Sequence, residues 1–133
     1  MSSTRRLSLD VLPGRFALCR LAGEADLPPW TRVARRFLTV TRTPGELSII
    51  ADAEVVPAGA AAVSDYCALR VCGPLALDVV GVIAALVPPL ADAGIPILPI
   101  ATHDTDYLFL RESDLARAIA ALEGAGHEVQ GEA

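Results

Sequence analysis

The alternation of apolar and polar positions divides the chain into short stretches typical of strands and two longer stretches typical of helices. The most apolar region, residues 95–110, predicts two strands joined by the polar turn Thr102–Asp106. Because both arms are apolar, we expect this hairpin in the middle of a sheet, with its turn facing outward. The short polar side chains of the turn can hold its backbone rigid or present oxygen atoms to a ligand.

The remainder of the second half has a regular pattern around this hairpin. We predict a strand at 66–71 and an apolar helix at 77–93 before the hairpin, then a helix from 113 or 114 to 124 and a strand at 127–129 after it. Pro88 and Pro89 should kink the first helix or break it near Leu86, because proline cannot donate a helical hydrogen bond. The resulting order β-α-β-β-α-β is ferredoxin-like.

The first half contains strand patterns but only weak helix patterns. Strands are predicted at 7–12, 15–21, 37–43 and 46–51, with a short helix at 30–36 and a connector at 52–65. Trp30, the only tryptophan, is expected to cover the core of this half. His127, near the other end of the chain, has no evident partner in the sequence and is expected at the surface.

Two segments of the chain resemble each other. FLTVTRTPGELSII and ILPIATHDTDYLFL each contain a strand, a Thr-rich turn, an acidic residue and a second strand, with Thr41 aligned on Thr102. This similarity and the similar element order suggest two tandem copies of one unit. We therefore predict an α+β protein with antiparallel sheets, a degenerate first copy at 7–60 and a second copy at 61–130.

Composition and charge exclude several classes of function. The net charge of −5 and the absence of lysine argue against nucleic-acid binding, which requires clustered cations. The longest apolar run, residues 79–90, is shorter than the roughly 20 residues of a membrane-spanning helix. The three cysteines follow no CxxC pattern and are expected as reduced thiols, which favours a cytoplasmic protein.

No catalytic motif is recognisable, so we expect no enzyme activity, no catalytic residue and no cofactor. Asp104 and Asp106 either stabilise their turn or bind a ligand. His103 together with these two acids is also a weak candidate for a divalent metal site, although further ligands are missing.

The second half resembles a known family at specific residues. Gly73-Pro74-Leu75, the segment near Asp78-Val-Val-Gly81 and PLADAGIPILPIATHDTDYLFL are similar to the tandem ACT-domain proteins, as is FLTVTRTPGELSIIAD in the first half. These proteins are related to the regulatory ACT domains of aspartate kinase and to the animal arginine sensor CASTOR. The resemblance extends over residues 7–129.

The resemblance implies a regulatory βαββαβ fold that binds a small ligand, typically an amino acid, where ACT units meet. It implies that the ligand contacts the loop after the first strand together with the start of the first helix, and the turn after the second strand. Asp106 is the position implied for the α-ammonium group. The candidate ligand-binding residues are Leu75, Ala76, Leu77, Asp78, Val79, Gly81, Thr102, His103, Asp104, Thr105 and Asp106. Asp78 either adds an acid at the helix start or caps the helix, which leaves arginine a doubtful ligand.

The alternative hypothesis is a protein–protein interaction or oligomerisation module without a ligand. Its sheet edges and apolar helices would then form the contacts, and the turn acids would serve only solubility and capping. A homodimer is left open under both hypotheses.

Overall fold

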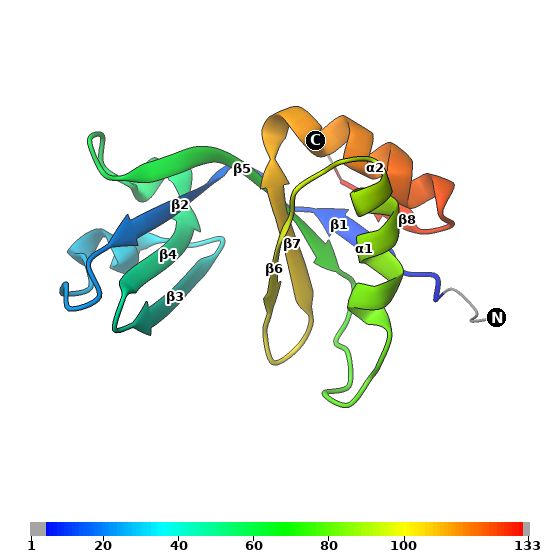
Figure 1. Ribbon diagram of the computed structural model, residues 1–133, viewed down its shortest axis with the longest axis horizontal. Helices are drawn as coiled ribbons and strands as arrows, with labels where there is room; N and C mark the ends of the chain where they lie inside the picture. Colours follow the sequence, from blue (N-terminus) through cyan, green and yellow to red (C-terminus); the bar gives the residue numbers. More distant parts are fainter. Residues whose placement is uncertain (1–4, 132–133) are drawn as a thin grey trace. The chain divides into compact units, whose positions relative to one another are not determined.

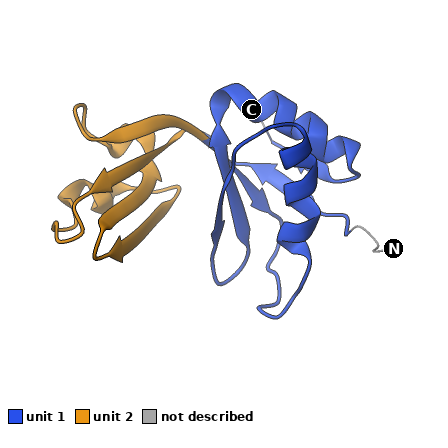
Figure 2. Ribbon diagram, viewed as in Figure 1, with its two compact units in different colours: residues 1–13, 67–133 blue, residues 14–66 orange. Residues whose placement is uncertain are grey.

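The computed structural model describes residues 5–131, which form two compact units. The C-terminal unit contains the described residues up to Pro13 together with those from Cys67 onward, and the inserted unit is Gly14–Tyr66 (Figure 2). This division differs from the sequence-based boundary at residue 60. The first strand, predicted to belong to the first copy, pairs within the C-terminal unit instead.

The C-terminal unit is a sheet with two α-helices (Figure 1). Its elements are β1 (Ser8–Val11), the later part of β5 (Ala62–Val71), α1 (Val82–Asp92), β6 (Leu98–Ala101), β7 (Asp106–Arg111), the 3-10 turn η3 (Glu112–Asp114), α2 (Leu115–Gly124) and β8 (Glu128–Gln130). From β5 onward this is the predicted order β-α-β-β-α-β. The strands lie in the order β6-β7-β5-β1-β8.

Strand β1 lies between β5 and β8, antiparallel to the first and parallel to the second. Its register places Leu9 opposite Val71 and Val129. Leu9 and Val11 are buried in the same core as the two helices, which explains why β1 belongs to this unit.

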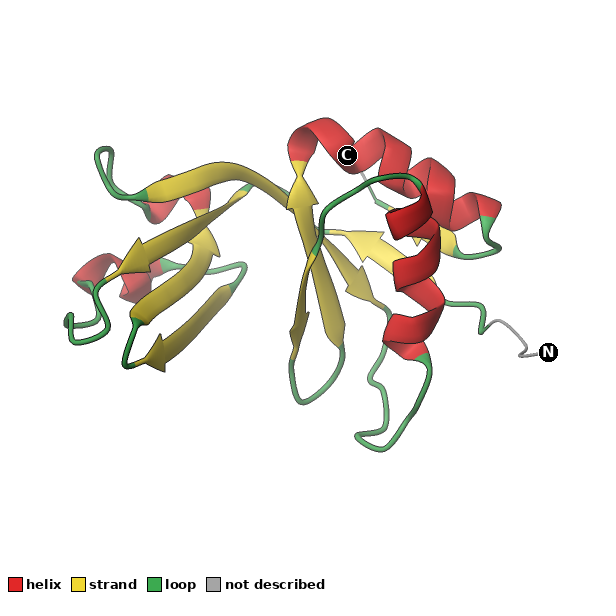
Figure 3. Cartoon of the chain, viewed as in Figure 1, coloured by secondary structure: helices red, strands yellow, loops and turns green. Residues whose placement is uncertain are grey.

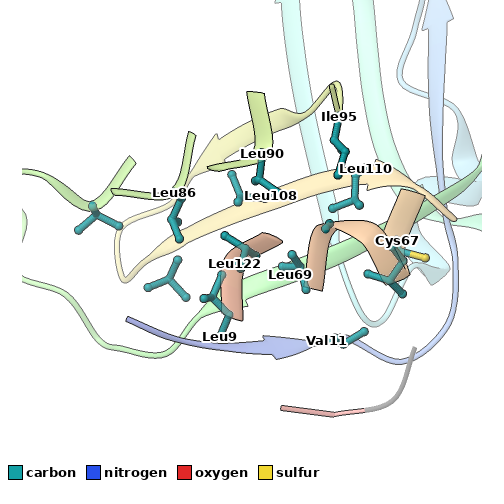
Figure 4. Packing of buried hydrophobic residues seen from close by; sticks show 14 residues of the cluster. Leu9, Val11, Cys67, Leu69, Leu86, Leu90, Ile95, Leu108, Leu110 and Leu122 are labelled. Carbon is teal, nitrogen blue, oxygen red and sulfur yellow. The ribbon is translucent and has the colours of Figure 1, made fainter. Parts of the chain in front are cut away.

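The core of the C-terminal unit is aliphatic (Figure 4). Helix α1 buries Val82, Leu86 and Leu90, and these residues recur every four positions along one face. They pack against strand residues such as Leu69 and Leu108. The burial of these helix and strand side chains holds α1 against the sheet.

Helix α1 differs from its predicted form at both the start and the prolines. It begins at Val82 rather than at residue 77, after Gly81 with φ of 90°, so Asp78 is not its N-cap. The helix continues through Pro88 and Pro89 to Asp92 instead of breaking in two. Neither proline can donate to the carbonyl four residues earlier, which leaves the Ala84 and Ala85 carbonyls without a helical donor.

His127 supplies one of the missing donors. Its side chain is buried, with an exposed fraction of 4%, and Nε2 lies 3.1 Å from the carbonyl oxygen of Ala85. The backbone N–H of Leu7 donates to Nδ1 over 3.1 Å. The prediction of a surface position for His127 was therefore wrong: the ring joins α1 to the segment before β1.

The hairpin of β6 and β7 is only partly central. Strand β7 lies between β5 and β6 and buries Leu108, Phe109 and Leu110. Strand β6 pairs only with β7 among the described strands and is an edge strand that contains Pro99. An edge strand tolerates proline because its outer N–H groups need no partner in the sheet.

The inserted unit contains strands and two 3-10 turns, which Figure 3 colours red as helices, and no α-helix among its residues 14–66. Its elements are β2 (Phe16–Leu21), η1 (Pro29–Val33), β3 (Leu38–Thr43), β4 (Glu46–Asp52), η2 (Ala53–Val55) and the first part of β5. The strands are antiparallel in the order β3-β4-β2-β5. The short predicted helix is thus only η1, and Trp30 in it packs on the buried cluster of β2 and β4 as expected.

Candidate functional site

The loop between β5 and α1 and the turn between β6 and β7 meet in the C-terminal unit. The backbone N–H of Leu75 donates to the carbonyl oxygen of Asp104 over 2.7 Å. At Gly73, a Cβ atom would lie 2.9 Å from the Leu75 nitrogen and 3.3 Å from the Asp104 carbonyl oxygen. The absence of a side chain at Gly73 therefore allows the two segments to approach closely.

The turn after β6 is held by its two threonines. The Thr102 hydroxyl donates to the Thr105 carbonyl over 3.0 Å and accepts from the Thr105 N–H over 3.3 Å. The buried Thr105 hydroxyl donates to the Val71 carbonyl over 2.6 Å. Both threonines hold the turn in place, as the alternative of turn-capping residues predicted.

A cavity of about 470 Å³ lies between these segments and the first turn of α1. It is lined by Leu75, Ala76, Leu77, Val79, Gly81, Val82, Ile83, Ala84, Ala101, Thr102, His103, Asp104, Thr105 and Asp106. The structure thus brings together every candidate residue from the sequence except Asp78, which lies in the loop but outside the lining. Sequence reasoning missed residues 82–84, because it started the helix too early, and also Ala101 at the end of β6.

The cavity combines aliphatic walls with acidic groups at one side. Asp106 is partly buried at the start of β7, whereas His103 and Asp104 are exposed and form a pair with Nδ1 and Oδ1 2.9 Å apart. The lining contains no arginine or lysine. The first turn of α1 adds backbone N–H groups and a partial positive charge, since a helix leaves its first donors without helical partners.

Neither a metal centre nor a reactive thiol is evident in the described residues. No group of three or more His, Cys, Asp or Glu side chains is arranged for a metal ion within residues 5–131. The cysteines are free, and burial raises the pKa of the Cys19 and Cys72 thiols, which disfavours the nucleophilic thiolate. No helix in this described range is long and apolar enough to span a membrane.

Comparison with known proteins agrees with this architecture. Residues 61–124 match the model of a family described as an ACT domain, and residues 14–59 match a second model described only as an N-terminal domain. Protein Atu0741 from Agobacterium tumefaciens is 30% identical in a match that covers 97% of this chain and 96% of that one, with a TM-score of 0.89. This chain belongs to the same family as Atu0741, and its residues 61–124 match an ACT domain. No curated protein sequence matches it.

More distant structures share the fold of this ACT-domain protein. VC0802 from Vibrio cholerae matches with 21% identity, a TM-score of 0.71 and coverage of 90% of this chain and 89% of that one. The regulatory subunit of aspartate kinase from Thermus thermophilus matches with 14% identity, a TM-score of 0.59 and coverage of 85% and 93%. The expected relation to regulatory ACT folds is therefore confirmed at the level of the fold.

Proposed function

We propose that this ACT-domain protein is a regulatory protein that binds an amino acid in the cavity between the β5–α1 loop and the β6–β7 turn. The observation that carries this proposal is that residues 75–77 and Val79, the start of α1 and Thr102–Asp106 line one cavity. The fold neighbours include the regulatory subunit of aspartate kinase, which the match covers over 93% of its length, and this supports a regulatory role. The free cysteines suit a reducing compartment, so the cytoplasm is part of the proposal.

An amino acid has two charged groups that the cavity can complement. The first turn of α1 offers backbone N–H groups to the α-carboxylate. Asp106, which is also part of the lining, offers a carboxylate to the α-ammonium group. Asp104 is the weaker candidate for this role because it is exposed and already paired with His103.

The cavity walls favour a neutral, aliphatic side chain on the ligand. Leu75, Val79, Val82 and Ile83 provide apolar surface, and no cationic side chain is present to pair with a second carboxylate. An additional acid for a basic ligand was one of the two roles left open for Asp78, but Asp78 lies outside the lining and cannot pair with such a ligand there. We therefore expect branched aliphatic amino acids to bind more tightly than aspartate, glutamate or arginine.

Replacing Asp106 with asparagine should weaken amino-acid binding by more than about tenfold without unfolding the protein, because a charged hydrogen bond contributes about 1.5–3 kcal/mol. Isothermal titration calorimetry measures the affinity. Asp92→Asn is the matched control, because it makes the same change of charge at an exposed position of α1 outside the lining. Equal affinities in the two variants would remove Asp106 from the site.

The inserted unit is best explained as a degenerate ACT copy. Both units connect their strands as β-x-β-β-x-β, with 3-10 turns in the inserted unit where the C-terminal unit has helices. Their hairpins also share a cap: the Thr43 hydroxyl accepts from the N–H groups of Gly45 and Glu46 over 3.2 Å, as Thr102 does from Thr105. This pairs Thr43, not Thr41, with Thr102. The tandem arrangement is part of this proposal.

An interaction module without a ligand is the second candidate. It is favoured by one observation, the concentration of exposed apolar side chains in the inserted unit. Thermal melting in the presence of amino acids distinguishes the two functions. A ligand that binds the native protein raises its melting temperature, whereas a module without a ligand shows no such rise.

A further inference from the structure

Thr105 is part of the cavity lining, but its hydroxyl proton is used inside the protein. The residue is 5% exposed, and its hydroxyl donates over 2.6 Å to the carbonyl oxygen of Val71, the last residue of β5. A threonine hydroxyl carries one proton, so this bond uses the only donor of the side chain. Thr105 therefore cannot also donate a hydrogen bond to a ligand.

The Thr105–Val71 hydrogen bond helps to tie the two walls of the cavity together. A backbone bond of 2.7 Å from the Leu75 N–H to the Asp104 carbonyl joins the same two segments. Gly73 lies between these bonds in the sequence, and a Cβ atom at this position would be 3.4 Å from the Cβ atom of Thr105. The β5–α1 loop and the β6–β7 turn are thus held against each other without a ligand.

The position of the Asp106 carboxylate depends on Thr105. Asp106 follows Thr105 directly and begins β7, so a displacement of Thr105 also moves Asp106. Polar groups of a binding site have to be held within about 0.5 Å of the geometry that the ligand requires. A preformed arrangement also reduces the conformational freedom that is lost on binding. The hydroxyl of Thr105 can therefore affect ligand affinity without touching the ligand.

We propose that Thr105 is a positioning residue of the amino-acid site: it fixes Asp106 through the hydrogen bond to Val71 and does not donate to the ligand. This role differs from the one that the family resemblance implies, in which Thr105 contacts the ligand. The inference rests on the proposed function, because it concerns the same cavity.

Isothermal titration calorimetry with valine, leucine and isoleucine tests this role in two variants. Thr105→Val keeps the shape of the side chain but removes the hydroxyl. It should weaken binding at least about tenfold, as expected when a buried hydrogen bond that positions the site is lost. Thr105→Ser restores the hydroxyl and should bind within about threefold of the wild type.

Thr31→Val is the matched control for a purely structural effect. Thr31 is 2% exposed, its hydroxyl donates to the Pro28 carbonyl over 2.7 Å, and it lies outside the cavity lining. This variant should melt at a lower temperature than the wild type but bind with unchanged affinity. The titrations are made at a temperature where circular dichroism shows every variant to be folded. An equal loss of affinity in Thr31→Val would assign the effect to general destabilisation and overturn the proposal.

Amide hydrogen exchange of the ligand-free wild type gives a test that needs no variant. The Leu75 amide should exchange at least about 100-fold more slowly than an unstructured amide, because the walls are tied before a ligand binds. Fast exchange of this amide, wild-type affinity in folded Thr105→Val, or no recovery in Thr105→Ser would overturn the proposal.

Failure of the proposed function has a different result. A wild type that binds none of these amino acids would refute amino-acid binding and, with it, the role of Thr105 in affinity. The exchange of the Leu75 amide separates the two cases, because it reports whether the walls are tied and does not depend on a ligand.

Discussion

Asp52→Ala is expected to lower the free energy of unfolding by about 3–5 kcal/mol, the largest effect predicted for the inserted unit. The Asp52 side chain is 2% exposed and accepts hydrogen bonds from the backbone N–H groups of Arg35, Arg36 and Phe37 over 2.8–3.1 Å. Alanine leaves these three part-buried donors without their partner, and a donor shielded from water that loses its bond costs about 1–3 kcal/mol. Urea denaturation followed by circular dichroism measures the loss.

The same carboxylate predicts a dependence of stability on pH. Burial disfavours its charged form, but the three N–H donors outweigh this and hold the pKa of Asp52 below its ordinary value. A carboxyl with a lowered folded-state pKa stabilises the fold above its unfolded-state pKa of about 3.9. That contribution is lost as pH falls through the folded-state pKa, so the wild type and Asp52→Asn should converge in stability in strong acid.

Glu54→Ala is the control for Asp52. Glu54 lies two residues away, but its carboxylate is 59% exposed and pairs only at the surface with Arg36 over 2.7 Å. Exposed ion pairs contribute little to stability. A loss in Glu54→Ala as large as that in Asp52→Ala would show that general charge, rather than the three backbone bonds, stabilises this region.

His127→Ala should lower the free energy of unfolding by about 3 kcal/mol, because two hydrogen bonds and buried ring volume disappear together. The Leu7 N–H loses its acceptor, and the Ala85 carbonyl loses a donor that Pro89 cannot replace. Thermal melting and urea denaturation of the full chain both measure this effect.

The second histidine of the chain provides the comparison. The His103 side chain is 83% exposed and pairs with the neighbouring Asp104 side chain. His103→Ala should therefore change stability by less than about 0.5 kcal/mol. If the two variants had the same stability, the bridging role of His127 would be refuted.

The elements of the C-terminal unit were predictable because their patterns are local. Apolar residues at helical spacing predicted α2, and two apolar runs around the turn Thr102–Asp106 predicted β6 and β7. The candidate site followed from the same patterns, since the loop before α1 and this turn line one cavity.

The remaining features depend on contacts between distant residues. The apolar sequence from residue 77 onward is compatible with a helix. The helix nevertheless begins at Val82, after Gly81 in a left-handed backbone conformation that the hydrophobic pattern does not predict. The pairing of β1 with β8 and the burial of His127 join residues about 120 positions apart. Alternation predicts that such segments form a strand, but it does not specify the partner.

Unit boundaries and the exposure of an edge strand depend on the same distant pairing. The first strand looked like part of the first half, yet its side chains complete the core of the second. Likewise, Leu38 and Val40 have a normal strand pattern, and only the position of β3 at the end of its sheet exposes them.

The most direct test of the central claim is a thermal-shift screen of the purified protein against the twenty amino acids at millimolar concentration. A ligand present at about 100 times its dissociation constant stabilises the native state by about 2.7 kcal/mol, which raises the melting temperature by several degrees. We predict such a rise with one or more branched aliphatic amino acids, and its loss in Asp106→Asn but not in Asp92→Asn. A flat response across all twenty amino acids would contradict amino-acid binding and leave the interaction module as the function.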